Sequence, residues 1–321
     1  MNPIIRGIVA GFIASASIVA LAESFPTKTV RLVSQFPPGG GTDVVARLLA
    51  PNLSESTGQA FVVENKAGAA GNIGADYVAK SPADGYTVLV GNNALVTNAA
   101  MPQQLPFDVL RDFAPVAMVA SVALALAVHP SVEARSVKEL VELVRSQPGK
   151  WAYSSCGNAT PMHLTAELFR QVTKLDMAHV PYKGCGPAIA DGVGGHVPVL
   201  FNNISGLVAQ AKAGKLRVLA VASARRSAVE PSIPTIAEAG YEGFESSIWI
   251  GFLVPAGTPR EIVQKLNAEL NKAANLPDIQ EKMRAQLLDH HSTTPEEFAA
   301  QIRSDIAKWA KVIRAANIRP N

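Results

Sequence analysis

Short runs of aliphatic and β-branched residues alternate with helical patterns along this chain, and this alternation limits the possible folds most strongly. It is typical of parallel sheets built from β-α-β units. A first series of strands is expected at residues 29–34, 61–64 and 87–91, with helices at about 43–55 and 73–80 between them. The sequence therefore predicts the α/β class.

A second series of strands is expected at residues 124–128, 151–155, 177–180, 197–201 and 216–222. Ser136 and Glu139 form a capping-box pattern, and Thr160 precedes Pro161 as an N-cap precedes a first-turn proline. An apolar strand region at 245–254 leads into two long helices. Both are expected to begin with a Thr-Pro-x-Glu capping box, at 258–261 and 294–297.

The first 22 residues predict export. Arg6 is followed by an uncharged apolar stretch at 7–19, and Ala-Leu-Ala at 20–22 is a small-x-small cleavage pattern. The stretch is too short to span a bilayer. We therefore expect a signal peptide at residues 1–22 that is cleaved after Ala22.

About 300 residues remain, which is large for one core and comfortable for two. We expect two α/β lobes, each a mostly parallel sheet flanked by helices. The first lobe contains residues 23–124 and 245–321, and the second contains residues 125–244. Removal of the leader takes away one Arg and lowers the formal charge from +3 to +2. With no clustered Lys/Arg run, nucleic acid is not an expected partner.

A Gly-rich turn, Phe-Pro-Pro-Gly-Gly-Gly-Thr-Asp at residues 36–43, joins the first strand to the first helix. Its glycines allow close backbone approach to a ligand, and the free amides at a helix start favour an anion. It is neither a Walker loop nor a dinucleotide fingerprint, because the Gly-Lys-Ser/Thr and G-x-G-x-x-G patterns are missing. A plain tight turn is an equally good interpretation of this loop alone.

A second strand-to-helix loop, Tyr-Ser-Ser-Cys-Gly-Asn-Ala-Thr at residues 153–160, falls in the other lobe. Ligands of open α/β sheets bind beyond the carboxyl ends of strands. Two such loops facing across a cleft can hold a carboxylate by helix dipoles, without an Arg. Residues 91–93, 181–186 and 202–205 also end strands, and Lys183 is their one cation. Lys183 as a surface residue and Trp249 as a core residue remain open alternatives to ligand contact.

Enzyme interpretations are weaker. Cys156 and His163 form a conceivable nucleophile and base, but an i,i+4 pair of His163 with Glu167 is favoured. His290 and His291 are expected to face solvent, and no metal spacing accompanies them. No G-x-S-x-G or H-E-x-x-H motif and no paired catalytic carboxylates occur. We expect no enzyme activity, no metal and no cofactor.

The chain is similar to the Bug-type substrate-binding proteins of tripartite tricarboxylate transporters, because many short sequence blocks match the pattern of that family in the same order. They lie at residues 36–43 with 46–47, 63–68, 71–74, 83–87, 112–116, 153–160 with 163–164, 180–184, 213–217, 235–240 and 254–259. The resemblance covers nearly the whole mature chain. It implies a two-lobed periplasmic binding protein (Venus-flytrap) fold that closes over a small carboxylate for integral-membrane transporter subunits.

The resemblance also implies a ligand-binding set in which the loops at 38–43 and 154–160 grip one carboxylate. The expected set is Pro38, Gly39, Gly40, Gly41, Thr42, Asp43, Asn92, Asn93, Ser154, Ser155, Gly157, Asn158, Ala159, Thr160, His163, Tyr182, Lys183, Gly184, Asn202, Asn203 and Trp249. We expect a periplasmic monomer. A ligand sensor for a membrane signalling partner and, less favoured, a Cys-dependent hydrolase are the alternatives.

The chain departs from the commoner family pattern at Cys156, Cys185, Ala159 and the Asn202-Asn203 pair. Asn202-Asn203 stands where an acid is frequent, which weakens the case for amino-acid ligands. Dicarboxylates, tricarboxylates and aromatic carboxylates stay open. Each cysteine follows a strand of the second lobe, and we predict a Cys156–Cys185 disulfide if those strands are adjacent. Two small buried thiols are the competing interpretation.

Overall fold

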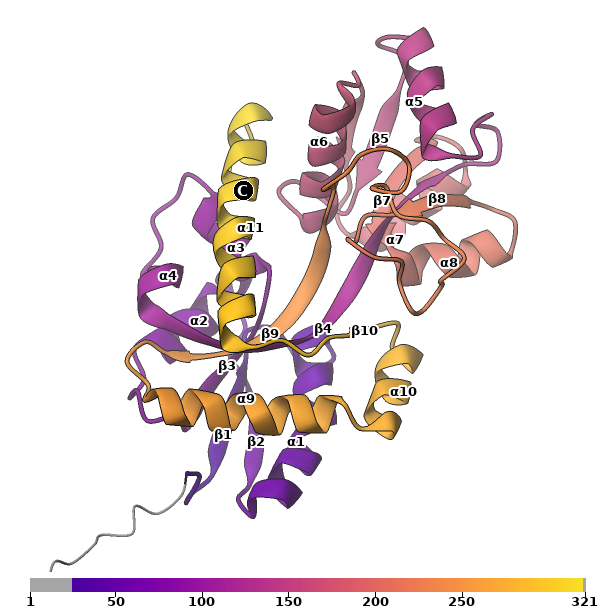
Figure 1. Ribbon diagram of the computed structural model, residues 1–321. Coiled ribbons are helices and arrows are strands. Elements are labelled where there is room, and N and C mark those ends of the chain that lie inside the picture. The colour runs from indigo at the N-terminus through magenta and orange to yellow at the C-terminus, as the bar shows by residue number, and fades with distance from the viewer. Residues whose placement is uncertain (1–24, 320–321) are drawn as a thin grey trace, which may run out of the picture.

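The structure is a computed structural model that describes residues 25–319; the expected export signal at residues 1–22 lies outside this range. Two lobes stand side by side and are joined by two long strands (Figure 1). Within residues 25–319, no helix combines the length and apolar character needed to cross a bilayer. The α/β two-lobed fold expected from the sequence is confirmed.

The first lobe is built on three parallel strands, in the spatial order β2-β1-β3. Their bounds are β1 Val30–Ser34, β2 Phe61–Asn65 and β3 Thr87–Asn92. The strands are rich in Val and Leu because helices cover both faces of the sheet. Their carboxyl ends meet at one edge, which faces the second lobe (Figure 1).

Two long antiparallel strands connect the lobes: β4, Phe113–Val128, and β9, Ser247–Pro255. They pair from Phe113↔Pro255 to Ala123↔Ser247. β9 also pairs with β3, and the short β10, Asp289–His290, pairs with β4 at Ala120 and Ser121. From Leu124 onward, β4 pairs with strands of the second lobe.

The second lobe repeats the parallel arrangement, with β5 between β6 and β7. Its strands are β5 Ala152–Ser155, β6 Ala178–Pro181, β7 Val199–Asn203 and β8 Arg217–Val221. β7 and β8 lie antiparallel to the end of β4. The single sheet path therefore runs through both lobes.

Helices cover both faces of the sheet in the first lobe. The first-lobe helices are α1 Gly41–Thr57, η1 Ala69–Gly71, α2 Asn72–Ala79, α3 Ala94–Ala100, α4 Val109–Asp112, α9 Arg260–Ala274, α10 Pro277–Ala285 and α11 Pro295–Ala315. One buried cluster joins α1, α9 and α10 to the sheet, and another joins α2, α3 and α11 to its other face.

Two further clusters fill the second lobe. Its helices are α5 Val137–Ser146, α6 Pro161–Thr173, α7 Cys185–Val193 and α8 Ile204–Lys212. α5 and α6 pack on one face of the sheet, and α7 and α8 on the other.

Three expectations about elements need correction. The strand expected at 124–128 begins at Phe113, and a separate helix, α10, lies between the two long terminal helices. The capping box expected at 258–261 is absent, because Thr258 Oγ1 donates to the Pro255 carbonyl and α9 begins after Pro259 without a side-chain cap. The capping box of Thr294 and Glu297 is confirmed.

We expect Gly251→Ala to lower the free energy of unfolding by about 2 kcal/mol, because overpacking a core costs this much. A Cβ at Gly251 would lie 2.3 Å from Phe298 Cζ and 3.0 Å from the Ala117 carbonyl oxygen. Urea denaturation measures the loss. Gly186→Ala in α7 is the control, since a Cβ there meets no atom within 4 Å. Equal losses in both variants would contradict the packing argument.

Candidate ligand-binding site

The Gly-rich loop between β1 and α1 is braced from inside the protein. The Asp43 side chain, 3 % exposed, accepts hydrogen bonds from Gly39 N (2.9 Å), Asn65 Nδ2 (2.8 Å) and Arg47 Nε (3.0 Å). Burial alone would raise its pKa, but hydrogen bonds from Arg47, Gly39 and Asn65 lower the pKa to about 2. This carboxylate therefore organises the loop and is already committed to internal partners.

The Thr42 side chain likewise has a partner inside the protein. Its Oγ1 shares a 2.8 Å hydrogen bond with Ser34 Oγ at the end of β1, and both residues are buried. The side chains of Thr42 and Asp43 hold the turn that leads into α1, and ligand contact by these two residues stays a prediction. α1 begins at Gly41 without a side-chain cap, so the first-turn amides have no side-chain partner.

The second loop leads from β5 into α6. Thr160 is the N-cap expected from the sequence: its hydroxyl accepts from His163 N, and Pro161 opens the helix. The same hydroxyl donates to the Gly157 carbonyl at 2.8 Å. Gly157 has φ +136°, and a Cβ there would lie 3.1 Å from the Tyr182 carbonyl oxygen. Glycine is therefore required for both backbone conformation and space.

A disulfide ties this loop to the neighbouring strand. Cys156 follows β5, Cys185 begins α7, and the structure joins their sulfurs. β5 and β6 are adjacent and parallel, with Ser155 opposite Pro181. Both thiols in the described residues are therefore bonded, which removes a free Cys156 as a nucleophile.

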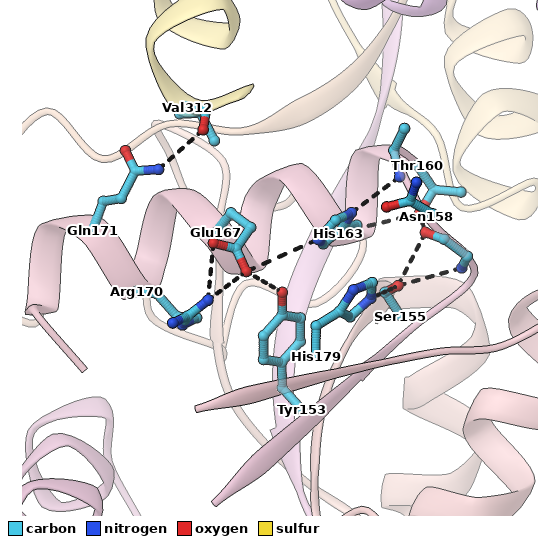
Figure 2. Close-up of polar contacts among 12 residues, drawn as sticks. Tyr153, Ser155, Asn158, Thr160, His163, Glu167, Arg170, Gln171, His179 and Val312 are labelled. Carbon is cyan, nitrogen blue, oxygen red and sulfur yellow. Dashed lines mark hydrogen bonds and ion pairs between the residues drawn. The ribbon is translucent and has the colours of Figure 1, made fainter. Parts of the chain in front are cut away.

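A buried polar network lies behind the second loop (Figure 2). The Tyr153 hydroxyl donates to Glu167 at 2.5 Å, and Arg170 Nη1 donates to both Glu167 oxygens at 2.8 and 3.0 Å. The ring of His163 stacks on that of His179 with centroids 3.7 Å apart. The carboxylate of Glu167 thus has strong partners although it is 4 % exposed.

The two histidines connect this network to the loop backbone. His163 Nδ1 accepts from Ala159 N at 3.0 Å, and His179 Nε2 shares a 2.7 Å hydrogen bond with Ser155 Oγ. Burial lowers the pKa of His163 to about 3 and that of His179 to about 4. Both rings are therefore neutral near pH 7. The i,i+4 pair of His163 with Glu167 is present: the Nε2 of the neutral ring lies 3.9 Å from the Glu167 carboxylate.

A cavity of about 670 Å³ opens between the lobes at the carboxyl ends of the strands. Its walls come from the loops before α1 and α2, from α3, from the start of α6 and from the connecting strand β9. The lining residues are Phe36, Ala69, Ala70, Asn72, Asn92, Asn93, Ala94, Thr97, Asn98, Met101, Gln103, Asn158, Ala159, Thr160, Pro161 and Ile248. No ionisable side chain from residues 25–319 lines this cavity.

Five of the expected ligand-binding residues line the cavity: Asn92, Asn93, Asn158, Ala159 and Thr160. The others lie outside its lining: Pro38, Gly39, Gly40, Gly41, Thr42, Asp43, Ser154, Ser155, Gly157, His163, Tyr182, Lys183, Gly184, Asn202, Asn203 and Trp249. Ser154 and Asn202 are buried in the second lobe, whereas Pro38, Gly39 and Lys183 are exposed. The cavity lining therefore includes residues of the second loop and of the end of β3, and from the Gly-rich turn at 36–43 it includes Phe36 alone.

Two aromatic residues of the expected set have internal hydrogen-bond partners. Trp249 is 2 % exposed, donates from Nε1 to Asp305 at 3.0 Å and packs edge-on against Phe298. It is a core residue, the alternative to ligand contact that the sequence left open. The Tyr182 hydroxyl donates to Asp191 at 2.6 Å, and burial together with that bond raises the pKa of Tyr182 to about 12.

His290 and His291 are half-buried, which corrects the expectation that they face solvent. His291 Nε2 shares a 2.8 Å hydrogen bond with Ser121 Oγ on β4, and burial lowers the pKa of both histidines. Among the described residues, no group of three or more His, Cys, Asp or Glu side chains is placed to hold a metal ion.

The sequence missed most of the first-lobe wall, in particular Asn72, Thr97, Asn98, Met101 and Gln103. Asn98 Nδ2 donates to Asn72 Oδ1 and to the Ala70 carbonyl, so these segments meet although they are far apart in the chain. The only sequence signal was positional: each segment follows a strand that ends at the cleft.

Acid should destabilise this site. His163 and His179 are neutral in the folded protein, whereas the unfolded chain protonates them below about pH 6.5. The stability that depends on these two neutral rings is fully present above that pH. It is lost as the pH falls toward 4 and then 3. Between pH 7 and 4.5 we expect a loss of about 2 kcal/mol from each of these two groups, measured by urea denaturation. The double variant His163→Gln, His179→Gln should lose less stability over the same pH range.

Removing the disulfide by the double change Cys156→Ser, Cys185→Ser should lower the free energy of unfolding by about 3 kcal/mol. The bridge closes a segment of sequence separation 29, and the unfolded chain gains entropy when it is opened. Urea titration with and without reductant measures the effect: reductant should destabilise the wild-type protein and leave the variant unchanged. An equal response of both proteins would contradict this assignment.

Comparison with known proteins identifies the family. Residues 45–318 match the model of the TctC family, described as the tripartite tricarboxylate transporter family receptor. Protein BugT of Bordetella pertussis is 38 % identical over 94 % of both chains. Among solved structures, Rpa4515 of R. palustris with adipate is 37 % identical, with a TM-score of 0.73 over 92 % of this chain and 100 % of the other.

MatC from Rhodopseudomonas palustris with bound malate is 30 % identical, with a TM-score of 0.68 over 90 % of this chain and 100 % of that one. The Bug-type resemblance seen in the sequence is therefore confirmed, and so is the prediction of a protein without enzyme activity, because this family consists of receptors. The chain belongs to the tripartite tricarboxylate transporter receptor family and is a substrate-binding protein.

Proposed function

We propose that this protein binds a small organic carboxylate in the cavity between its lobes and delivers it to the membrane subunits of a tripartite tricarboxylate-type transporter. One observation favours an anionic ligand most. The first residues of α3 and α6, Ala94 and Pro161, both lie in the wall of a cavity that no ionisable side chain of residues 25–319 lines. The start of a helix presents the positive end of the helix dipole to a negative group. The attraction here comes from the dipole, because Ala94 N already donates to Asn92 Oδ1 and Pro161 has no N–H.

The relatives support the same ligand class. Rpa4515 and MatC were solved with adipate and malate, both of which are small carboxylates. Each matches at least 90 % of this chain, so the similarity includes both lobes and the cavity between them. At identities of 37 % and 30 %, the relatives do not fix which carboxylate binds here. That preference depends on the residues of this chain.

We infer a periplasmic location and a monomeric state for the mature protein, residues 23–321. Export rests on the sequence of residues 1–22, and the periplasmic binding protein BugD is among the similar structures. We retain 23–124 with 245–321 and 125–244 as the proposed lobe limits. This division agrees with the change of partner strand after Ala123 and with the start of β9 at Ser247.

The proposal predicts stabilisation of residues 23–321 by carboxylates and not by sugars or amines. A bound ligand raises the melting temperature by mass action, so a thermal-shift panel of mono-, di-, tri- and aromatic carboxylates measures binding directly. Calorimetry of each hit should give one site and no product. Stabilisation by sugars or cations with none by carboxylates would overturn the proposal.

A negative charge placed in the cavity wall should weaken carboxylate binding. We expect Ala94→Glu to bind the best carboxylate of the panel about tenfold more weakly, or worse, than Ala94→Gln, because like charges repel in a partly desolvated cavity. The two side chains have nearly the same size, so their affinity ratio isolates charge from steric effects. Glu at the first residue of α3 also suits the helix dipole. Equal affinities would place the carboxylate elsewhere.

A further inference from the structure

Asn93 has an amide oxygen with no partner although it is almost completely buried. The residue follows β3, lines the cavity and is 2 % exposed. Its Nδ2 donates to the Ser247 carbonyl at the start of β9, at 3.2 Å. Its Oδ1 is buried and accepts no hydrogen bond from the described residues.

The direction of this amide is fixed by its partner. A carbonyl oxygen accepts but cannot donate, so the nitrogen of Asn93 must face Ser247 and the oxygen must face away. Burial of an amide oxygen without a donor is costly, and most buried polar groups in native proteins have a hydrogen-bond partner, from the protein or from water. The oxygen therefore requires a donor that the described residues do not supply.

The neighbouring amides do not supply it either. Asn92 Oδ1 accepts from Ala94 N at 2.9 Å and from Gln35 Nε2 at 3.1 Å. The side-chain nitrogen of Gln35 is therefore used in the bond to Asn92. The Oε1 of Gln35 is also buried and has no donor. Where β1 and β3 end, buried acceptors are thus in excess.

The donor needs to be a neutral one. An ammonium group would enter a cavity in which no carboxylate side chain of residues 25–319 stands in the wall. The nearby carboxylate of Asp43 is bound by Arg47, Asn65 and Gly39 and lies outside that wall. Burying a cation without a counter-charge is much more costly than burying a hydroxyl group. A hydroxyl group donates one hydrogen bond and brings no charge.

We propose that the natural ligand is a hydroxycarboxylate whose hydroxyl group donates to Asn93 Oδ1, so that Asn93 selects hydroxylated acids over their deoxy counterparts. This inference rests on the proposed carboxylate-binding function and specifies the ligand within it. Because Asn93 is tied to β9 as well as to β3, the acceptor is held at the junction of the two lobes.

The test uses pairs of acids that differ by one hydroxyl group: malate and succinate, 3-hydroxybutyrate and butyrate, and mandelate and phenylacetate, with both enantiomers of each hydroxy acid. Calorimetry on residues 23–321 gives the dissociation constants. In the best-binding pair we expect one enantiomer of the hydroxy acid to bind at least about tenfold more tightly than the deoxy acid, because the deoxy acid leaves the oxygen unpaired.

Variants then assign the effect to one side chain. Asn93→Leu has nearly the same volume and no acceptor, so the preference for the hydroxy acid should fall from about tenfold to about equal binding. Asn271→Leu is the matched control. Asn271 also has a buried oxygen without a donor, but it lies in α9 outside the cavity. Its replacement should leave the preference unchanged.

The outcomes separate the two proposals. If no carboxylate binds, the proposed function itself fails. If carboxylates bind but no hydroxy acid is preferred by the wild-type protein, the function stands and the role of Asn93 is wrong. The wild-type comparison needs no variant, so it remains decisive even if Asn93→Leu fails to fold. A preference that survives in a folded Asn93→Leu protein would also overturn the assignment.

Discussion

The antiparallel pairing of β4 with β9 is the constraint on which the rest of the structure depends. This ladder runs from Phe113↔Pro255 to Ala123↔Ser247. Beyond Ala123, β4 pairs with strands of the second lobe. Small residues along it let helices approach closely, as Gly251 does beneath Phe298. The ladder also supplies contacts at the cleft: Ile248 lines the cavity, and Ser247 holds Asn93. The distance between the lobes is therefore set by the same strands that shape the site.

The parallel parts of both lobes could be predicted because their signal is local. Each parallel strand is a short apolar run with a helix after it, and the observed bounds differ by one or two residues from those expected. β4 could not be predicted in full, because Pro115 and several alanines between Phe113 and Ala123 are poor strand signals. Its partner β9 lies far along the chain and forces the extended conformation. At the start of α9 the sequence predicted a feature that does not form. The capping box expected from Thr258 is replaced by a turn in which the Thr258 hydroxyl donates to the Pro255 carbonyl.

The site was predictable in its backbone and less so in its side chains. Strand-to-helix loops meet at one edge of a parallel sheet, so residues 92–93 and 158–160 could be expected there. The same rule cannot say whether a polar side chain faces the cleft or the interior. Asp43 and His163 face inward because loop amides need acceptors, at Gly39 N and Ala159 N. Asn98 and Gln103 carry no local pattern; only the packing of α3 against the loop before α2 brings them to the wall.

Charges are kept behind this site and not within it. The carboxylates that brace the two loops have partners: Asp43 binds Arg47, and Glu167 binds Arg170 and Tyr153. The cavity wall itself offers neutral amides, a threonine hydroxyl and helix starts. A helix dipole contributes only about 0.3–2 kcal/mol to holding a charge, whereas a desolvated ion pair is strong and costly to break. A receptor must release what it binds, and weak attractions distributed over two lobes are lost together when the lobes separate. An uncharged wall therefore suits the proposed function, because it combines selection, through the acceptor proposed at Asn93, with an affinity that permits delivery.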